Sequence, residues 1–303
     1  MNKTKLVTIV GTTASGKSSL GIDLAEHYRT EIVSADSRQV YKHLDLGTGK
    51  VTPEETARVK HHLIDILELN EPFSMAEFQR LAYEAIDGIR AKGMLPLMVG
   101  GTGLYTRSVV EGYNLVDAPP DEQLRKKLSE KSIDELRKIL SEYGVTDIPT
   151  ETSERRMVRM IEKKMAGFDI ENESEPRYDV LQLGLTFDRE TLYRRIAERL
   201  DLRIAEGMIE EVEEVMRLGA TPEFLEKLGL EYRYTYRYLT GRYASRREYR
   251  DELYKEICHF AKRQGTWFRK EKNIVWLDSS ADYLAEAKRL IEAFLLQREN
   301  KIP

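Results

Sequence analysis

The chain has 303 residues, of which 41% are hydrophobic and 33% charged, and its formal net charge is −4. This composition excludes collagen-like, low-complexity and mainly disordered chains and predicts a globular protein with a sizeable core. The single cysteine, Cys258, excludes an internal disulfide and a multi-thiolate zinc site. We find no apolar run long enough for a signal peptide or a membrane span, so we expect a cytoplasmic protein with no membrane partner.

Short aliphatic runs alternate with helical patterns along the chain. The runs that predict strands end in polar or glycine-containing turns and lie at residues 6–10, 31–34, 62–65, 95–99, 180–187 and 273–277. Amphipathic spacing predicts helices at residues 17–28, 74–92, 189–216 and 283–297, with 189–216 as one long helix. The alternation indicates an α/β fold with a mostly parallel sheet and helices on both faces.

Two later segments differ from this pattern. Residues 119–178 are charged and helical without a convincing buried strand, so we interpret them as a helical insertion between two parts of the core, residues 1–118 and 179–303. Residues 229–272 hold 12 Lys or Arg against 6 Asp or Glu, together with ten aromatic residues. Such a mixture fits RNA binding by phosphate contact and base stacking. Amphipathic helices that bury tyrosines and expose arginines would have the same composition.

The first predicted strand continues into a glycine-rich loop. Gly11, Gly16, Lys17 and Ser18 stand in the spacing G-x-x-x-x-G-K-[ST], directly before a helical pattern. In such a P-loop the backbone N–H groups and the lysine hold phosphate oxygens, and the serine hydroxyl can bind Mg²⁺. The predicted phosphate-binding residues are Gly11, Thr12, Thr13, Ala14, Ser15, Gly16, Lys17 and Ser18. The loop by itself indicates only that a di- or triphosphate binds.

Residues at the ends of the other strands must therefore indicate which reaction the protein catalyses. The strand at residues 95–99 runs into glycines and Thr102 without the terminal acid of a motor ATPase, which leaves kinases of small molecules open. Asp36 follows the strand at 31–34, at the sheet edge where α/β folds bind ligands. There Asp36 can act as a general base or merely cap a turn. The neighbouring Ser37 and Gln39 offer groups that can pair with a base edge.

In these motifs the sequence resembles the tRNA dimethylallyltransferases, also called tRNA isopentenyltransferases. The matching motifs, in chain order, are the P-loop, Ser34 to Tyr41 with Asp45, Gly47, Thr48 and Lys50, then His61, His62, Asp65, Phe73, Ser74 and Phe78, then Val99 to Tyr105, and finally Arg195, Arg199, Gly207 and Glu211. The resemblance implies transfer of a dimethylallyl group from dimethylallyl diphosphate to N6 of the adenosine 3′ to the anticodon, with Mg²⁺ as the cofactor.

The resemblance also implies roles for single residues. Lys17, Arg199 and Ser18 with Mg²⁺ would neutralise the departing diphosphate, and Thr102 would donate a hydrogen bond near its bridging oxygen. Asp36 would take the proton from N6. The residues expected to contact the tRNA anticodon stem-loop are Asp36, Ser37, Arg38, Gln39, Thr102, Arg155, Arg156, Arg159, Tyr232 and Arg233. Because the target base must turn out of the anticodon loop to react, a channel open at both ends is expected.

The chain departs from the usual pattern of this family in three places. Thr12 stands where the loop commonly has proline, Thr152 to Glu154 replace the usual Asn-Asp ahead of the paired arginines, and Leu228 to Arg233 replace a Gly-Tyr element. Individual RNA contacts in the last two segments are therefore open, and Arg155, Arg156 and Arg159 fit a solvated helix face equally well.

Three other functions fit part of the sequence. These are an isopentenyltransferase for free adenine nucleotides, a P-loop kinase of small molecules and a non-catalytic RNA-binding module. The insertion and the basic segment favour tRNA over a mononucleotide, which needs neither. His61 and His62 do not suggest a metal pair, because adjacent residues of a strand point to opposite faces, and Cys258 is expected in the core. We expect a monomer.

Overall fold

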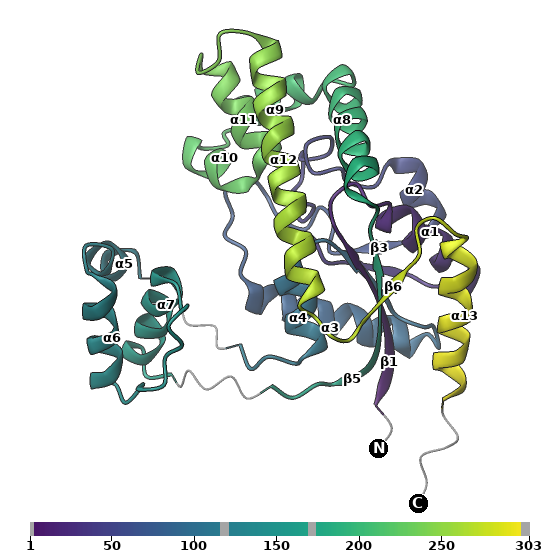
Figure 1. The fold of residues 1–303 in the computed structure, drawn as a ribbon, viewed down its shortest axis with the longest axis horizontal. Helices are drawn as coiled ribbons and strands as arrows, with labels where there is room; N and C mark the ends of the chain where they lie inside the picture. The colour runs from purple at the N-terminus through teal and green to yellow at the C-terminus, as the bar shows by residue number, and fades with distance from the viewer. Residues whose placement is uncertain (1–2, 116–120, 169–173, 298–303) are drawn as a thin grey trace, which may run out of the picture. The chain divides into compact units, whose positions relative to one another are not determined.

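The computed structural model describes residues 3–115, 121–168 and 174–297, and the chain divides into two compact units (Figure 1). The larger unit comprises Met1–Gly112 and Pro176–Pro303, and the smaller comprises Tyr113–Glu175. The smaller unit thus begins and ends earlier than the insertion expected at residues 119–178. An antiparallel bridge between Tyr113 and Ser174 closes its base.

A sheet of six parallel strands forms the centre of the larger unit. In chain order the strands are β1 (Thr4–Gly11), β2 (Ile32–Ser34), β3 (His61–His62), β4 (Leu97–Gly100), β5 (Tyr178–Leu185) and β6 (Ile274–Leu277). Their order across the sheet is β3-β2-β4-β1-β5-β6. Val7 of β1 lies beside Leu97 on one side and Leu181 on the other. Because every pair is parallel, β1, β2 and β4 all end at one edge, and the predicted α/β class is confirmed.

Helices cover both faces of this sheet. Successive side chains of β1 point to opposite faces, and apolar residues lie on both, so each face needs a covering layer. Val7 and Ile9 face α1 (Lys17–Tyr28) and α13 (Tyr283–Leu296) in one apolar cluster. Leu6 faces the other way, toward α3 (Met75–Ala91) and α4 (Gly103–Val110). A short helix, α2 (Pro53–Arg58), precedes β3.

Five further helices gather at the edge where β1, β2 and β4 end (Figure 1). They are α8 (Arg189–Ala205), α9 (Met208–Arg217), α10 (Pro222–Leu228), α11 (Leu230–Leu239) and α12 (Arg246–Arg269). The apolar stripe of α8 packs on α12, with Ile196 and Leu200 in the same cluster as Ile257. Through α9, Val212 packs with Leu44 and Tyr232, which ties α11 to the loop after β2. These helices therefore surround the end of the sheet that carries the P-loop.

Two predicted elements are wrong in their extent. Residues 189–216 do not form one helix: the chain breaks at Gly207, whose φ of 107° lies in the left-handed region that favours glycine, between α8 and α9. The strand expected at residues 62–65 is limited to His61–His62, because Leu63 (φ 62°) and Asp65 (φ 55°) turn the backbone out of the extended region.

The two histidines of β3 have separate partners within the protein. His61 Nδ1 lies 2.8 Å from the carbonyl oxygen of Val59, and His62 Nε2 lies 2.7 Å from Glu31 Oε2. Cys258 is buried in the α8–α12 cluster, which confirms its place in the core.

The smaller unit is a bundle of three helices, α5 (Glu122–Leu128), α6 (Ile133–Glu142) and α7 (Glu154–Met165). Its core contains Leu128, Leu136 and Ile161. The buried carboxylate of Glu162 accepts hydrogen bonds from the Asp121 N–H at 3.0 Å and from Arg125 at 2.7 and 3.0 Å, which joins α7 to α5. Across the described parts of both units, we find no helix with the length and apolar character of a membrane span.

Candidate active site

A cavity of about 390 Å³ lies at the carboxyl edge of the sheet, entirely within the larger unit. Its walls come from the P-loop, the turns after β2 and β4, and helices α8, α11 and α12. The predicted site residues that line it are Thr13, Lys17, Ser18, Asp36, Ser37, Arg38, Gln39, Thr102 and Arg199. Residues far apart in the sequence are thus brought to one place by the parallel sheet. A second cavity, of about 440 Å³, shares Lys17, Ser18 and Arg199 with the first and lies on the α8 side of the P-loop.

The cationic side of the cavity is built from α1 and α8. Arg195, Arg199 and Arg203 are spaced by four residues, so they lie on one face of α8. Arg195 Nε donates a 2.8 Å hydrogen bond to the carbonyl oxygen of Ala14, and the Arg199 guanidinium donates to Thr13 Oγ1. The helix therefore holds the P-loop from one side while it presents charge to the cavity.

Two of these cations have lowered pKa values, although Glu231 lies 3.8 Å from Arg203 and partly offsets the effect on Arg199. Burial and the nearby Arg199 lower the pKa of Lys17 to about 8, an effect that Asp36 partly offsets. Burial and the nearby Arg203 lower the pKa of Arg199 to about 9. Like charges gathered in a partly desolvated cavity favour an anion between them. The geometry therefore supports an anion site at Lys17, Arg199 and Arg203.

Asp36 both holds a turn and lines the cavity. Its Oδ1 accepts hydrogen bonds from the backbone N–H groups of Arg38 at 2.9 Å and Gln39 at 3.4 Å. The turn is also held from β4, because the Ser37 N–H donates to Thr102 Oγ1 at 3.3 Å. Asp36 thus caps a turn and also faces the cavity, so the two interpretations of this residue are compatible. The capping hydrogen bonds fix the position of its carboxylate.

Two predicted RNA-contacting residues beside Asp36 are engaged within the protein. Gln39 Oε1 accepts a 3.1 Å hydrogen bond from the Ser34 hydroxyl, and Gln39 Nε2 donates to the carbonyl oxygen of Gly49 at 3.0 Å. Arg38 Nε donates to the carbonyl oxygen of Leu228. Both side chains line the cavity, and both also hold its wall together.

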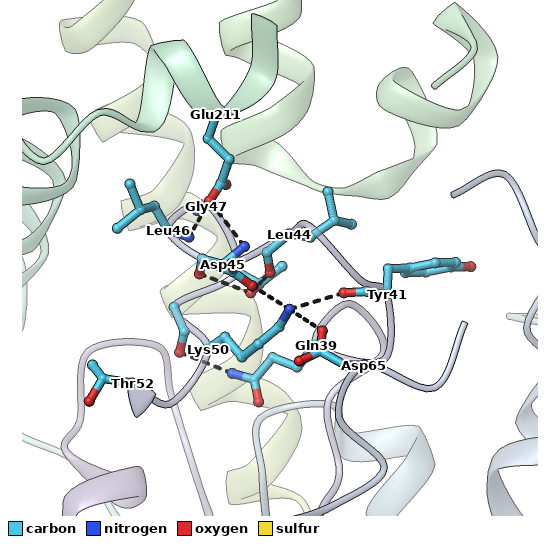
Figure 2. A network of polar contacts seen from close by, with 12 residues as sticks. Gln39, Tyr41, Leu44, Asp45, Leu46, Gly47, Lys50, Thr52, Asp65 and Glu211 are labelled. Atoms are coloured by element: carbon cyan, nitrogen blue, oxygen red, sulfur yellow. Dashed lines mark hydrogen bonds and ion pairs between the residues drawn. The ribbon is translucent and has the colours of Figure 1, made fainter. Parts of the chain in front are cut away.

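The loop after β2 is fastened by a polar network, which Figure 2 shows. The Glu211 carboxylate accepts hydrogen bonds from the N–H groups of Asp45, Leu46 and Gly47 at 3.1, 2.7 and 3.0 Å. On the other side of the loop, Lys50 Nζ lies 2.5 Å from Asp45 Oδ1 and 2.5 Å from Asp65 Oδ1. These motif residues keep Gly47, Thr48 and Gly49 in the cavity wall.

The remaining predicted RNA-contacting residues lie outside this cavity. Tyr232 is fully buried, and its hydroxyl donates a 2.6 Å hydrogen bond to Glu211 Oε1, so it is a core residue that RNA does not reach in this structure. Arg233 Nε donates to the carbonyl oxygen of Glu226 at 2.5 Å. In the smaller unit, Arg155 and Arg156 are exposed, and Arg159 pairs with Glu162 at 3.2 Å.

Several cavity residues were not singled out by the sequence analysis. Arg203 has a signal that could have found it, the four-residue spacing from Arg199. Phe260, Arg263, Gln264 and Trp267 line the cavity from α12. Their spacing of three and four along a helix places them on one face, but the composition of the basic segment alone does not show which face meets the P-loop.

Near the P-loop, the Ser18 hydroxyl could hold a divalent metal together with a bound diphosphate. Ser18 is exposed in the first turn of α1 and lines both cavities. In the described ranges, no group of three or more His, Cys, Asp or Glu is arranged to hold a metal on its own. Magnesium commonly takes one or two protein oxygens and completes its shell with substrate phosphates and water. The Ser18 hydroxyl fits that arrangement.

The sheet, the P-loop after its central strand and the anion site place the chain among the P-loop α/β enzymes. A family model described as IPP transferase matches residues 39–271. A tRNA dimethylallyltransferase 2 from Treponema denticola is 45% identical over 281 residues, which are 90% of this chain and 94% of that protein. A tRNA dimethylallyltransferase 1 from Geotalea daltonii is 43% identical over 293 residues, 93% of each chain. The chain therefore belongs to the IPP transferase family, as its motifs predict, and it is a prenyltransferase.

Solved structures agree with this assignment. The crystal structure of a full-length tRNA isopentenylpyrophosphate transferase from Bacillus halodurans matches with a TM-score of 0.74 and 34% sequence identity, over 97% of this chain and 98% of that one. The match thus includes both units of this chain.

Proposed function

We propose that this protein transfers a dimethylallyl group from dimethylallyl diphosphate to N6 of the adenosine 3′ to the anticodon in tRNA, and releases diphosphate. The observation that carries the proposal is the single cavity in which Lys17 and Arg199 stand with Asp36. A cationic cluster suits the leaving diphosphate, and a carboxylate suits the proton that the attacking amine must lose. The family membership and the names of the relatives agree with this chemistry.

The leaving group is stabilised by the cations. As the allylic C–O bond breaks, its electron pair goes to the bridging oxygen, and the diphosphate gains negative charge. Lys17 and Arg199 are already in place to meet that charge, so little reorganisation is needed. Arg203 extends the cationic surface toward the second cavity.

A divalent metal accompanies the diphosphate, as is general for transferases that use prenyl diphosphates, and we propose that it is Mg²⁺. The Ser18 hydroxyl would hold it beside the diphosphate oxygens, where it would supply positive charge to the leaving group. Thr102 Oγ1 accepts the Ser37 N–H at 3.3 Å, which leaves the threonine hydroxyl proton to donate to the diphosphate.

Asp36 accepts the proton. The N6 lone pair forms the new C–N bond to the allylic carbon, and one N6 proton passes to the Asp36 carboxylate. Since Oδ1 is engaged by the turn, we assign the proton to Oδ2. The hydrogen bonds from the N–H groups of Arg38 and Gln39 hold Oδ1, and this orients Oδ2 toward the proton that it accepts.

The substrate RNA is held by surfaces beyond the cavity. We assign the smaller unit to the anticodon stem-loop and Arg155 and Arg156 to its phosphates, because both side chains are exposed at the start of α7. Tyr232 is withdrawn from the set of contacts because it is buried. The second cavity shares Lys17 and Arg199 with the first, which supports a channel open at both ends, and we propose that the donor and the base enter from its two ends.

The experiment is incubation of the protein with radiolabelled dimethylallyl diphosphate, Mg²⁺ and unmodified tRNA. Label in the RNA supports the proposal. Label in AMP, when AMP is offered instead, would make the protein an isopentenyltransferase of free nucleotides. Phosphorylation of a small acceptor by ATP would make it a kinase, and RNA binding without any transfer would make it a non-catalytic RNA-binding module. The Asp36→Asn variant is the matched control, because it preserves the cationic side of the cavity.

A further inference from the structure

We propose that Gln264 is a positioning residue that fixes the P-loop relative to the turn that carries Asp36. It lies on α12 and lines the cavity. Its Oε1 accepts a 2.8 Å hydrogen bond from the Thr13 N–H. Its Nε2 donates a 3.0 Å hydrogen bond to the carbonyl oxygen of Gly101. One side chain therefore joins the P-loop to the turn after β4.

The connection continues in both directions from this amide. On the P-loop side, Thr13 Oγ1 accepts from the Arg199 guanidinium. On the other side, Gly101 is followed by Thr102, whose Oγ1 accepts the Ser37 N–H next to Asp36. Gln264 thus stands in the middle of a continuous path from the arginine that meets the diphosphate to the carboxylate that accepts the proton. This path adds a side-chain connection to the backbone pairing of β1, β4 and β2, and we propose that it fixes the final separation of the two groups.

Of glutamine, glutamate and methionine, which have similar length, only glutamine makes both contacts. An N–H group and a carbonyl oxygen face the side chain, so it must accept at one terminal atom and donate at the other. An ionised glutamate accepts but does not donate, and methionine has no donor and only a weakly accepting sulfur. Gln264 also lies close to the cationic group: a Cβ placed on Gly101 would stand 3.2 Å from Gln264 Nε2 and 3.4 Å from Lys17 Nζ. A carboxylate at position 264 would therefore place a negative charge beside Lys17.

This inference rests on the proposed function for its kinetic part. A displacement of about 1 Å between reacting groups costs about 10²-fold in rate. Gln264→Met should therefore lower kcat for prenyl transfer by about 10- to 100-fold. KM for the RNA should change less than threefold, because the phosphate contacts assigned to Arg155 and Arg156 lie in the smaller unit. Gln264→Glu keeps the acceptor for Thr13 but should bind inorganic pyrophosphate at least tenfold more weakly, since its charge opposes the anion.

The test compares wild type with Gln264→Met, Gln264→Glu and a control, Gln182→Met, whose side chain on β5 does not line this cavity. Four quantities are measured for each protein: kcat, KM for the RNA, the dissociation constant of pyrophosphate, and hydrogen exchange of the Thr13 amide. We expect fast Thr13 exchange in Gln264→Met only, and wild-type values throughout for the control. A merely structural role would lower the melting temperature and leave kcat of the folded protein unchanged.

The outcomes separate this inference from the proposed function. If wild type transfers the prenyl group and Gln264→Met keeps kcat within twofold, the positioning role is overturned. If wild type transfers nothing, the proposed function fails, and Thr13 exchange together with pyrophosphate affinity still tests the bridge. If both Gln264 variants keep the wild-type rate of Thr13 amide exchange and the wild-type affinity for pyrophosphate, the proposed bridge is overturned.

Discussion

Glu211 gives the sharpest test of how the cavity wall is held. Its carboxylate accepts three backbone N–H groups of the loop after β2 (Figure 2). It also accepts the hydroxyl of the buried Tyr232. A hydrogen bond to a charged acceptor contributes about 1.5–3 kcal/mol when it is well shielded. Because Glu211 is half-buried and the freed N–H groups regain water, we take about 1 kcal/mol for each of the four. Glu211→Ala should then lower the free energy of unfolding by about 3–5 kcal/mol.

The assay is urea denaturation followed by tryptophan fluorescence. Both tryptophans of the chain, Trp267 and Trp276, lie in the larger unit, so the signal reports that unit alone. Glu210→Ala is the control, because Glu210 is exposed in the same first turn of α9 and loses the same favourable interaction with the helix dipole. We expect a change below about 0.5 kcal/mol for the control. Amide exchange at Leu46 should accelerate in Glu211→Ala only.

A small effect would refute this reasoning. A surface substitution lowers the free energy of unfolding by less than about 1 kcal/mol. If Glu211→Ala has no larger effect than that, and amide exchange at Leu46 stays slow, the carboxylate does not hold the loop. Tyr232→Phe provides the intermediate case, since it removes one of the four bonds and should cost about 1 kcal/mol.

The other predictions concern the chemistry and the RNA. Asp36→Asn should lower turnover by about 10² or more with pyrophosphate affinity nearly intact, as expected for a lost general base, and normal turnover measured with saturating substrates would remove that role. Burial and Arg199 lower the pKa of Lys17 to about 8, so this side chain loses its charge as the pH rises through that value. The affinity of wild type for pyrophosphate, measured by calorimetry relative to Lys17→Arg, should therefore fall with a slope that approaches tenfold for each pH unit above 8. An affinity ratio that does not vary with pH would contradict this. Reversing the charges of Arg155 and Arg156 should weaken tRNA binding and flatten its dependence on salt, and an unchanged salt slope would mean that both arginines only face solvent.

The elements that the sequence predicts well are those with local signals. The strand, P-loop and helix over residues 4–28 follow from an apolar run, a spaced glycine pattern and an amphipathic period, all within one short stretch. The break at Gly207 is different, because the apolar spacing of α8 continues through Met208 into α9. Only the backbone angle of the glycine separates the two helices, and that angle has no signature in the pattern.

The site divides in the same way. Lys17, Asp36 and Thr102 each follow a predicted strand, and parallel strands end at one edge, so their meeting could be anticipated. Gln264 could not, because its role depends on which face of α12 packs against the P-loop. Tyr232 shows the reverse case: a tyrosine beside an arginine suggested RNA, whereas packing beside Gly47 buries it. Tertiary contacts, rather than local sequence, decide both.

The most direct measurement of the central claim is the stoichiometry of the reaction on a defined RNA. An unmodified anticodon stem-loop and dimethylallyl diphosphate are incubated with the protein, the RNA is digested to nucleosides for mass spectrometry, and released pyrophosphate is counted. We predict one adenosine that has gained C5H8 for each pyrophosphate released, with no requirement for ATP. Pyrophosphate release without an adduct, or consumption of ATP while every adenosine stays unchanged, would contradict the account.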